Sequence, residues 1–435
     1  MTSNQELWER AKLVIPGGNM LLSKRPELFL PGKWPAYYSR ASGCQVWDLE
    51  GKRYIDMALM GVGTNLLGYG NPEVDDAVRG AVSNGNMSSL NCPEEVYLAE
   101  KLTRLHPGAD MVRFARTGGE ATAIAVRIAR AASKRDKVAF CGYHGWHDWY
   151  LAANMVGDSL SEHLLPGLQP VGVPKSLNST ALAFRFNRIE ELETILETEK
   201  DLGVIIMEVS RNVLPQDGFL QKIRRLATQK EIVLIFDECT SGFRQNLGGL
   251  HLLYGVEPDI SVFGKALGNG YAITAVLGSK WVMEYAQSTF ISSTFWTERI
   301  GSVAALATLG VMEKCQAWEQ VGRIGNKIKE RWEDLSTEFE IPVEIYGLPA
   351  LPSFIFQGHN HTEYKTFLTQ EMLRKGFLAC DSVYVSLSHT DEFVEPYFDA
   401  LREVFQEIAR CEERGIDIQE KLEGPVCQTG FQRLN

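Results

Sequence analysis

The sequence has little positive charge for its length of 435 residues. Lysine and arginine together number 44 against 55 aspartate and glutamate residues, which gives a formal net charge of −11. Proteins that bind nucleic acid or an anionic membrane usually present a basic face, so this balance argues against both functions. The chain also lacks an apolar run of 18 residues, and its first residues lack the basic and apolar regions of a signal peptide. We therefore expect a cytoplasmic location.

Cysteine motifs and nucleotide-binding loops are missing as well. The eight cysteines are scattered without a CxxC pair, which disfavours a zinc site or a disulfide scaffold. His144 and His147 stand three residues apart, but no thiol or carboxylate follows at ligand spacing, so we expect no metal site. No GxxxxGK[ST] loop is present, which excludes the nucleotide hydrolases whose magnesium-binding carboxylates also end a strand.

What the chain does contain is a change of pattern along its length. A helix is predicted at residues 4–14, followed by a loop and a hairpin that turns at residues 48–51. From about residue 71, helices alternate with short apolar strands, which is typical of a mostly parallel α/β sheet. After about residue 317, long charged amphipathic helices surround weaker strands. The predicted segments are an N-terminal one that packs with the small domain (1–60), a large α/β domain (61–317) and a small C-terminal α+β domain (318–435).

Two of the predicted strands end at residues with possible chemistry. The apolar run 232–236 leads into Asp237, where a carboxylate is costly to bury unless a cationic group faces it. Lys265 follows the short apolar strand 260–263 and has small neighbours. A lysine that is desolvated in such a place loses basicity and becomes a nucleophile towards carbonyl groups. The ordinary alternatives are that Asp237 caps a turn and that Lys265 is a solvated surface lysine.

Two glycine-containing turns also follow strands. Gly118 and Gly119 lie between a strand and a helix, where glycine lets the backbone approach a ligand and the helix start attracts anions. Tyr143 lies in the aromatic segment 141–150 and could stack on a flat ligand. A plain turn and a group of aromatic side chains that covers the sheet edge are the alternative interpretations.

In combination and in this order, these motifs resemble the class III pyridoxal-phosphate-dependent aminotransferases, with the closest similarity to glutamate-1-semialdehyde 2,1-aminomutases. The resemblance runs from VIPGGNM at 14–20 to VSLSHTDEFVEPYFDAL at 385–401, and Lys265 lies 28 positions after Asp237 (265 − 237), the kind of spacing the family uses. It implies the α/β fold of fold-type-I PLP-dependent transferases, with a mostly parallel central sheet, helices on both faces and a smaller α+β domain. It also implies pyridoxal 5'-phosphate (PLP) as the cofactor.

The resemblance further implies roles for individual residues. Asp237 would keep the pyridine nitrogen of the cofactor protonated, and Lys265 would carry the cofactor as a Schiff base and later move the substrate proton. Gly118 and Gly119 would bind the phosphate through backbone N–H groups, although the family usually has threonine at the position of Gly119. The remaining implied contacts are Tyr143 stacked on one ring face, Cys239 against the other face in place of valine, the acidic Glu208, Asn212 near the phenolic oxygen, and Thr294 in the phosphate site of a partner subunit.

The segments expected near the substrate depart from the family. Residues 296–299, Trp-Thr-Glu-Arg, replace a small Gly/Asn/Pro-rich stretch. Lys24, Arg25 and Arg299 are candidates to bind an acidic group of the substrate, because an arginine fork matches a carboxylate. All three could instead be surface charges or interface ion pairs. Asp381 stands where many class III aminotransferases have an arginine for the donor carboxylate.

We therefore predict an enzyme, a PLP-dependent aminotransferase that moves an amino group between an amine donor and a carbonyl substrate through a lysine Schiff base and a pyridoxamine-phosphate intermediate. The alternative is an intramolecular glutamate-1-semialdehyde 2,1-aminomutase, and a third hypothesis is a non-catalytic cofactor-binding homologue. The resemblance also implies a homodimer with shared active sites.

Overall fold

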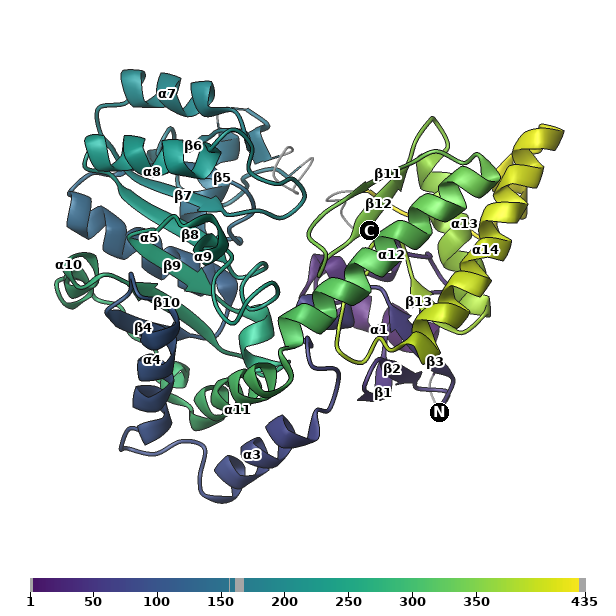
Figure 1. Cartoon of the computed structure of the whole chain (residues 1–435), viewed down its shortest axis with the longest axis horizontal. Helices are drawn as coiled ribbons and strands as arrows, with labels where there is room; N and C mark the ends of the chain where they lie inside the picture. Colours follow the sequence, from purple (N-terminus) through teal and green to yellow (C-terminus); the bar gives the residue numbers. More distant parts are fainter. Residues whose placement is uncertain (1–2, 156, 161–167, 430–435) are drawn as a thin grey trace. The chain divides into compact units, whose positions relative to one another are not determined.

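The computed structural model describes residues 3–155, 157–160 and 168–429 (Figure 1). Contacts divide the chain into two compact units, which we call the central unit (Pro72–Trp318) and the terminal unit (Met1–Asn71 with Glu319–Asn435). The domain bounds inferred from the sequence stay a prediction, because a division by contacts does not test which pieces fold by themselves. No helix among the described residues combines the length and the apolar character that a membrane span requires.

The central unit is built on a seven-stranded sheet with the order β4-β10-β9-β8-β7-β5-β6 (Figure 1). The strands are β4 (Met111–Ala115), β5 (Lys137–Cys141), β6 (Ala181–Ala183), β7 (Leu202–Glu208), β8 (Val233–Glu238), β9 (Ile260–Phe263) and β10 (Thr274–Gly278). The strands from β6 to β9 pair in parallel, and β10 pairs antiparallel with both β9 and β4. The predicted α/β fold with a mostly parallel sheet is confirmed.

Helices pack on both faces of this sheet. The longer helices of the central unit are α3 (Pro72–Ser83), α4 (Pro93–Leu105), α5 (Gly118–Ser133), α7 (Ile189–Thr198), α8 (Phe219–Gln229) and α11 (Arg299–Cys315). Helix α5 packs across β4, β10, β9, β8 and β7, and its apolar residues share one buried cluster with Val204 and Ile206 of β7. Since successive strand residues point to opposite faces, Ile205 and Met207 face the other side. Helix α8 packs on β8 outside the α5 cluster, so strand residues are buried on both faces.

Local sequence explains these elements. All six residues of β8 are buried, as expected for a parallel strand that is covered on both faces. Helix α8 buries Phe219, Leu220, Ile223 and Ala227, which recur at helical spacing on one side. Helix α5 begins with a capping box in which Thr117 is the N-cap residue.

The terminal unit contains a four-stranded sheet with the order β1-β2-β3-β13 and the hairpin β11-β12. The strands are β1 (Tyr38–Ser42), β2 (Gln45–Asp48), β3 (Arg53–Met57), β11 (Val343–Tyr346), β12 (Ser353–Phe356) and β13 (Phe377–Ala379). The longer helices are α1 (Asn4–Val14), α12 (Ala317–Phe339), α13 (His361–Arg374) and α14 (Asp391–Arg414). β2 and β3 form the hairpin predicted around residues 48–51, and β13 pairs in parallel with β3.

Candidate active site

Neighbouring parallel strands of the central sheet carry predicted site residues at the same edge. β7 ends at Glu208, β8 contains Asp237, and β9 leads through one glycine to Lys265. In the register of the sheet, Glu208 pairs with Asp237 and Asp237 pairs with Val262. β4 runs in the same direction as β9, because β10 is antiparallel to both, so α5 also begins at this edge. Ligands of open α/β sheets bind outside the carboxyl ends of the strands, which makes this edge the candidate active site.

Lys265 combines a strained backbone with a desolvated amine. It is the first residue of the 3-10 helix η6 (Lys265–Gly268) and has a positive φ of 37°, which is unusual for a residue with a side chain. Its Nζ donates a hydrogen bond of 2.8 Å to Oγ1 of Thr240. Burial lowers the pKa of Lys265 to about 8, and the positive charges of Arg211 and Arg244 act in the same direction. These properties suit a lysine that attacks a carbonyl group.

Asp237 is nearly fully buried and held from two sides. Its Oδ1 accepts the backbone N–H of Cys239 at 3.1 Å, and its Oδ2 lies 2.8 Å from Nδ1 of His144. Nε2 of His144 faces the carbonyl of Cys141 at 3.2 Å. The imidazole therefore bridges the end of β5 and the Asp237 carboxylate. His144 thus fixes the orientation of the Asp237 carboxylate.

Glu208 connects the ends of β5 and β7. Its Oε2 accepts the backbone N–H of Tyr143 at 3.1 Å, and its Oε1 lies 3.5 Å from Nη1 of Arg211. Gly142 permits this approach, since it has a φ of 110° and a Cβ there would lie 2.6 Å from Oε2 of Glu208. The Tyr143 side chain is 36% exposed, and burial of the rest raises the pKa of its hydroxyl. Asn212 is exposed.

The start of α5 offers backbone donors to an anion. In the capping box, Oγ1 of Thr117 accepts the N–H of Glu120, and the Glu120 carboxylate accepts the N–H of Thr117. The N–H groups of Gly118 and Gly119 lie in the first turn, where no intrahelical acceptor exists. Sγ of Cys239 would lie 3.4 Å from a Cβ at Gly118. Burial, followed by the charge of Asp237, raises the pKa of the Cys239 thiol well above its usual value, so the thiol stays protonated.

An unsatisfied ring nitrogen lies next to this turn. A Cβ on Gly119 would lie 2.9 Å from Nδ1 of His147 and 3.4 Å from Cδ1 of Trp146. Nδ1 of His147 is buried and has no hydrogen-bond partner within the described part of the chain. Two backbone N–H groups, space that a side chain would fill, and an orphaned ring nitrogen fit the phosphate of PLP. Asp237 and Lys265 at the same edge fit its pyridine nitrogen and its aldehyde.

Residues 296–299, whose sequence differs from that of the family, are held in place by contacts within the central unit. Thr294 is exposed in the 3-10 helix η8 (Thr294–Thr297). Nη2 of Arg116 donates 2.9 Å hydrogen bonds to the carbonyls of Trp296 and Glu298, and Nε of Arg116 lies 3.2 Å from Oε1 of Glu298. Arg116 directly precedes the capping residue of α5, so this ion pair fastens the segment beside the start of that helix.

The three cations proposed for the substrate differ in their surroundings. Arg299 donates through Nε and Nη2 to the two carboxylate oxygens of Glu94, at 3.1 and 2.6 Å. A substrate carboxylate would have to compete with this fork, because the Glu94 charge already compensates the guanidinium. Lys24 is exposed at the end of the 3-10 helix η1 (Leu22–Lys24), and Arg25 follows it half-buried. Their substrate roles stay a prediction.

Asp381 also has an internal partner. Its Oδ2 lies 2.9 Å from Nζ of Lys365 in the terminal unit. Burial opposes the charge on Lys365, but the Asp381 carboxylate outweighs it and raises the pKa of Lys365 above its usual value. Asp381 is therefore half of an ion pair, and its predicted place near the substrate stays a prediction.

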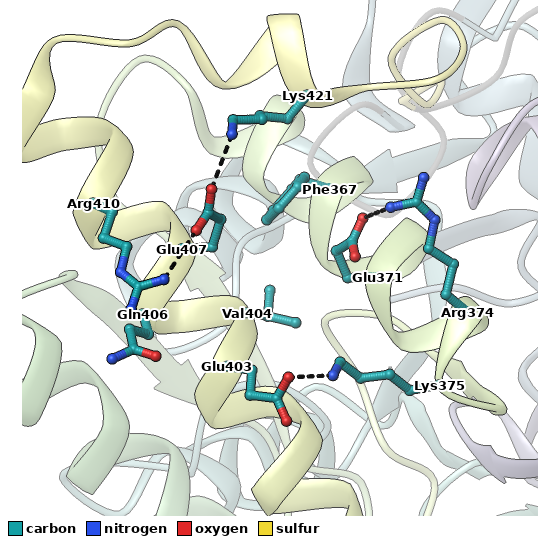
Figure 2. A pocket seen from close by; sticks show the side chains of 10 residues that line it. All are labelled: Phe367, Glu371, Arg374, Lys375, Glu403, Val404, Gln406, Glu407, Arg410 and Lys421. Carbon is teal, nitrogen blue, oxygen red and sulfur yellow. Dashed lines mark hydrogen bonds and ion pairs between the residues drawn. The ribbon is translucent and has the colours of Figure 1, made fainter.

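A pocket of about 360 Å³ in the terminal unit contains none of the predicted site residues (Figure 2). It is lined by Phe367, Glu371, Arg374, Lys375, Glu403, Val404, Gln406, Glu407, Arg410 and Lys421. Glu371 pairs with Arg374, Glu403 with Lys375, and Glu407 with Arg410 and Lys421 (Figure 2). Since each carboxylate meets a cation, the pocket keeps little charge for a ligand. No group of three potential metal ligands occurs within residues 3–155, 157–160 and 168–429.

Four residues of the site were not assigned by sequence reasoning. Thr240, Arg211 and Arg116 act through partners that only the fold brings near, so no local pattern marks them. His144 was marked, because it follows Tyr143 in a segment rich in aromatic residues, but the only role considered for it was zinc binding.

Comparison with known proteins agrees with this geometry. The FumI protein of Sphingopyxis sp. MTA144, solved in a PLP form, shares the fold with a TM-score of 0.85 and 24% identity, covering 95% of this chain and 98% of that one. The chain thus has the fold of this PLP-binding protein. The family model for class III aminotransferases matches residues 31–404. The chain belongs to this family, whose cofactor is PLP.

Two relatives are similar over nearly the whole chain. A 3-aminobutyryl-CoA aminotransferase of Cloacimonas acidaminovorans is 34% identical over 424 residues, which cover 94% of this chain and 98% of the relative. A glutamate-1-semialdehyde 2,1-aminomutase of Desulfovibrio desulfuricans is 33% identical over 427 residues, with 93% and 99% covered. The predictions of the family, the cofactor and an enzyme are confirmed.

Proposed function

We propose that the enzyme transfers an amino group between a separate amine donor and a carbonyl acceptor, with Lys265 as the residue that holds PLP. The observation that carries this proposal is the amine of Lys265, whose pKa burial lowers to about 8, at the sheet edge that also contains Asp237. At neutral pH this amine is partly unprotonated, as a nucleophile towards an aldehyde must be.

Each residue of the site then has a distinct task. PLP supplies a protonated pyridine ring that withdraws electrons when the substrate α-proton leaves. Asp237, oriented by His144, would keep the proton on the ring nitrogen, and such a charge-assisted bond is worth about 1.5–3 kcal/mol. Nζ of Lys265, once released by the incoming amine, would take the proton from the substrate carbon. Tyr143 would stack on one face of the ring, and Cys239 would pack against the other.

Smaller cofactor contacts follow the same assignment. Gly118 and Gly119 would bind the phosphate with their backbone N–H groups, and Glu208 would hold the loop of Tyr143 in place. Thr240, which accepts a hydrogen bond from Nζ of Lys265, would orient the amine. Asn212 would approach the phenolic oxygen of the cofactor.

An intramolecular aminomutase is the second candidate, supported by the 33% identity to the aminomutase of Desulfovibrio desulfuricans. The bulky segment at 296–299 and the 34% identity to an aminotransferase support transfer between two substrates. The test is absorbance spectroscopy with a panel of amines, including 3-aminobutyrate and 3-aminobutyryl-CoA, followed by keto and aldehyde acceptors. A transferase is converted to its amino form by a donor and returns only with an acceptor. Conversion of glutamate 1-semialdehyde without any second substrate would identify a mutase instead.

We also infer that the substrate carries an acidic group, for which Lys24, Arg25 and Arg299 are the candidate ligands and Asp381 a candidate neighbour. Support comes from the fit of arginine to carboxylates, whereas the existing pair with Glu94 argues against Arg299. Single alanine variants should lower kcat/KM for an acidic substrate at least about tenfold more than for a neutral one of equal size. If no variant does so, the proposal of an acidic substrate is wrong, and a neutral amine or an amino sugar becomes the expected substrate.

A cytoplasmic homodimer is the assembly we propose. Leu90 and Phe295 are 82% and 69% exposed, and their segments are joined by a hydrogen bond from the N–H of Arg299 to the carbonyl of Asn86. Exposed apolar side chains that gather on one surface favour a protein interface. Thr294 is exposed beside them and could reach the phosphate site of a second subunit.

A further inference from the structure

The orphaned nitrogen of His147 has no task in the proposed mechanism. Its Nδ1 is buried and lacks a hydrogen-bond partner in the described ranges of the chain, although most buried polar atoms in proteins have one. The ring lies against Trp146, with 4.4 Å between the ring centroids and 30° between the planes. A buried nitrogen without a partner beside the start of α5 points to a missing ligand.

The loop that carries His147 is fastened to the start of α5. The Thr122 hydroxyl in this helix donates a 2.8 Å hydrogen bond to the carbonyl of His144. Gly145, with a φ of 101°, comes so close to the helix that a Cβ on it would lie 2.7 Å from Cα of Gly119. Glycine is therefore needed at position 145, and this contact keeps the loop close to the first turn of α5.

Gly119 and His147 depend on each other. A Cβ at Gly119 would lie 2.9 Å from Nδ1 and 3.0 Å from Cε1 of His147, which is closer than ordinary contacts allow. Any side chain at position 119 must displace the imidazole. The threonine that the family resemblance leads one to expect at this position would place a hydroxyl where this chain places a ring nitrogen.

We propose that His147 is a ligand of the cofactor phosphate and that Gly119 is the residue that makes room for it. This inference rests on the proposed PLP site. Nδ1 would donate to a phosphate oxygen beside the N–H groups of Gly118 and Gly119, either as imidazolium or as the tautomer with its proton on Nδ1. This hydrogen bond would be charge-assisted, as one from a threonine hydroxyl to the same phosphate would be, so the imidazole could take the place of that hydroxyl.

A reciprocal exchange of the two residues tests this proposal. The affinity of the apoenzyme for PLP is measured by absorbance titration in the wild type, His147→Phe, His147→Ala, Gly119→Thr and the double variant Gly119→Thr/His147→Ala. His147→Phe keeps a ring without a donor and should weaken PLP binding at least about tenfold, which corresponds to about 1.4 kcal/mol. Gly119→Thr should also weaken PLP binding, because the new side chain would clash with the imidazole of His147. The double variant should bind more tightly than either single variant, because a hydroxyl then occupies the vacated space.

Controls separate this role from a structural one. His359→Asn changes an exposed histidine and should leave the affinity unchanged. The phosphorus NMR signal of bound PLP should shift in His147→Phe relative to the wild type. If His147→Phe folds poorly, His147→Ala also lacks the donor and serves in its place. His147→Asn, which retains a short donor, should then bind PLP more tightly than His147→Ala. Free imidazole should restore affinity to His147→Ala.

The possible failures are distinguishable. Wild-type affinity in His147→Phe, or a double variant no better than its parents, would overturn the role of His147 while leaving the PLP site intact. Borohydride reduction of the wild type that attaches the cofactor to a lysine other than Lys265 would overturn the proposed site itself, and the inference with it.

Discussion

The lowered basicity of Lys265 makes the rate of cofactor capture depend on pH in a defined way. Burial, with repulsion from Arg211 and Arg244, lowers the pKa from 10.5 to about 8. At pH 7 roughly a tenth of the amine is then unprotonated, about 300 times more than for an ordinary lysine. The unprotonated fraction of Lys265 should level off above about pH 8, whereas that of an ordinary lysine rises to pH 10 and beyond.

The assay is stopped-flow absorbance of apoenzyme mixed with PLP between pH 6.5 and 9.5, with Nα-acetyl-lysine amide as the reference amine. Dividing the two rates removes the ionisation of PLP itself. Below pH 8 the unprotonated fraction of both amines rises equally with pH, so the ratio of the Lys265 rate to the reference rate should be constant. Above pH 8 only that of the reference continues to rise, so the ratio should fall about tenfold per pH unit.

Arg211→Gln provides the matched variant. Removing this charge takes away repulsion, raises the pKa of Lys265 and moves the break in the ratio to higher pH. A ratio that stays flat to pH 9.5 in the wild type would show that the amine has ordinary basicity, and the desolvation of Lys265 inferred from the structure would be wrong.

Further predictions concern stability, chemistry and assembly. Lys265→Met should raise the free energy of unfolding of the apoenzyme in urea by about 3 kcal/mol below pH 8, because the substitution removes a buried charge. This stabilisation should decrease between pH 8 and 10.5, because the lysine of the unfolded wild-type chain also loses its proton in that range. Asp237→Asn should abolish most turnover with the fold intact; near-wild-type rates would contradict its role. Leu90→Asp should give monomers in sedimentation. The control Leu253→Asp changes an exposed residue of α9 (His251–Tyr254) and should leave the dimer intact. Dimers in both variants would place the interface elsewhere.

Much of the fold could be predicted because its signals are local. Helix α1 begins and ends at the predicted residues 4 and 14, and the buried strand β8 follows from an apolar run that needs no distant partner. Strand β10 was not predicted, and its antiparallel direction depends on how the chain returns from η6. The pairing of β13 with β3 joins residues more than 300 positions apart, which no local pattern reports.

In the candidate site, too, some residues could be predicted from local sequence and others could not. Asp237 and Lys265 were recognisable, because Asp237 lies near the end of a buried strand and Lys265 follows another. These strands are parallel neighbours and end at the same edge of the sheet. The partners of the charged residues were not recognisable. Arg299 and Glu298 looked like free charges in the sequence, but they meet Glu94 and Arg116, more than 180 positions away. Residue type indicates a charge, and only the fold shows whether that charge is already compensated.

This distinction bears on where the enzyme could bind an acidic substrate. The guanidinium of Arg299 is matched by both oxygens of Glu94, the nearer at 2.6 Å, so a substrate carboxylate must first separate a good ion pair. Arg211 meets Glu208 at only 3.5 Å and still acts on Lys265 strongly enough to lower its pKa. A charge that repels the ammonium of Lys265 attracts anions to the same place. Burial is the larger cause of the lowered pKa of Lys265, and the charge of Arg211 adds to it. That added positive charge would also favour an anionic substrate at the site, which supports the proposal of an acidic substrate.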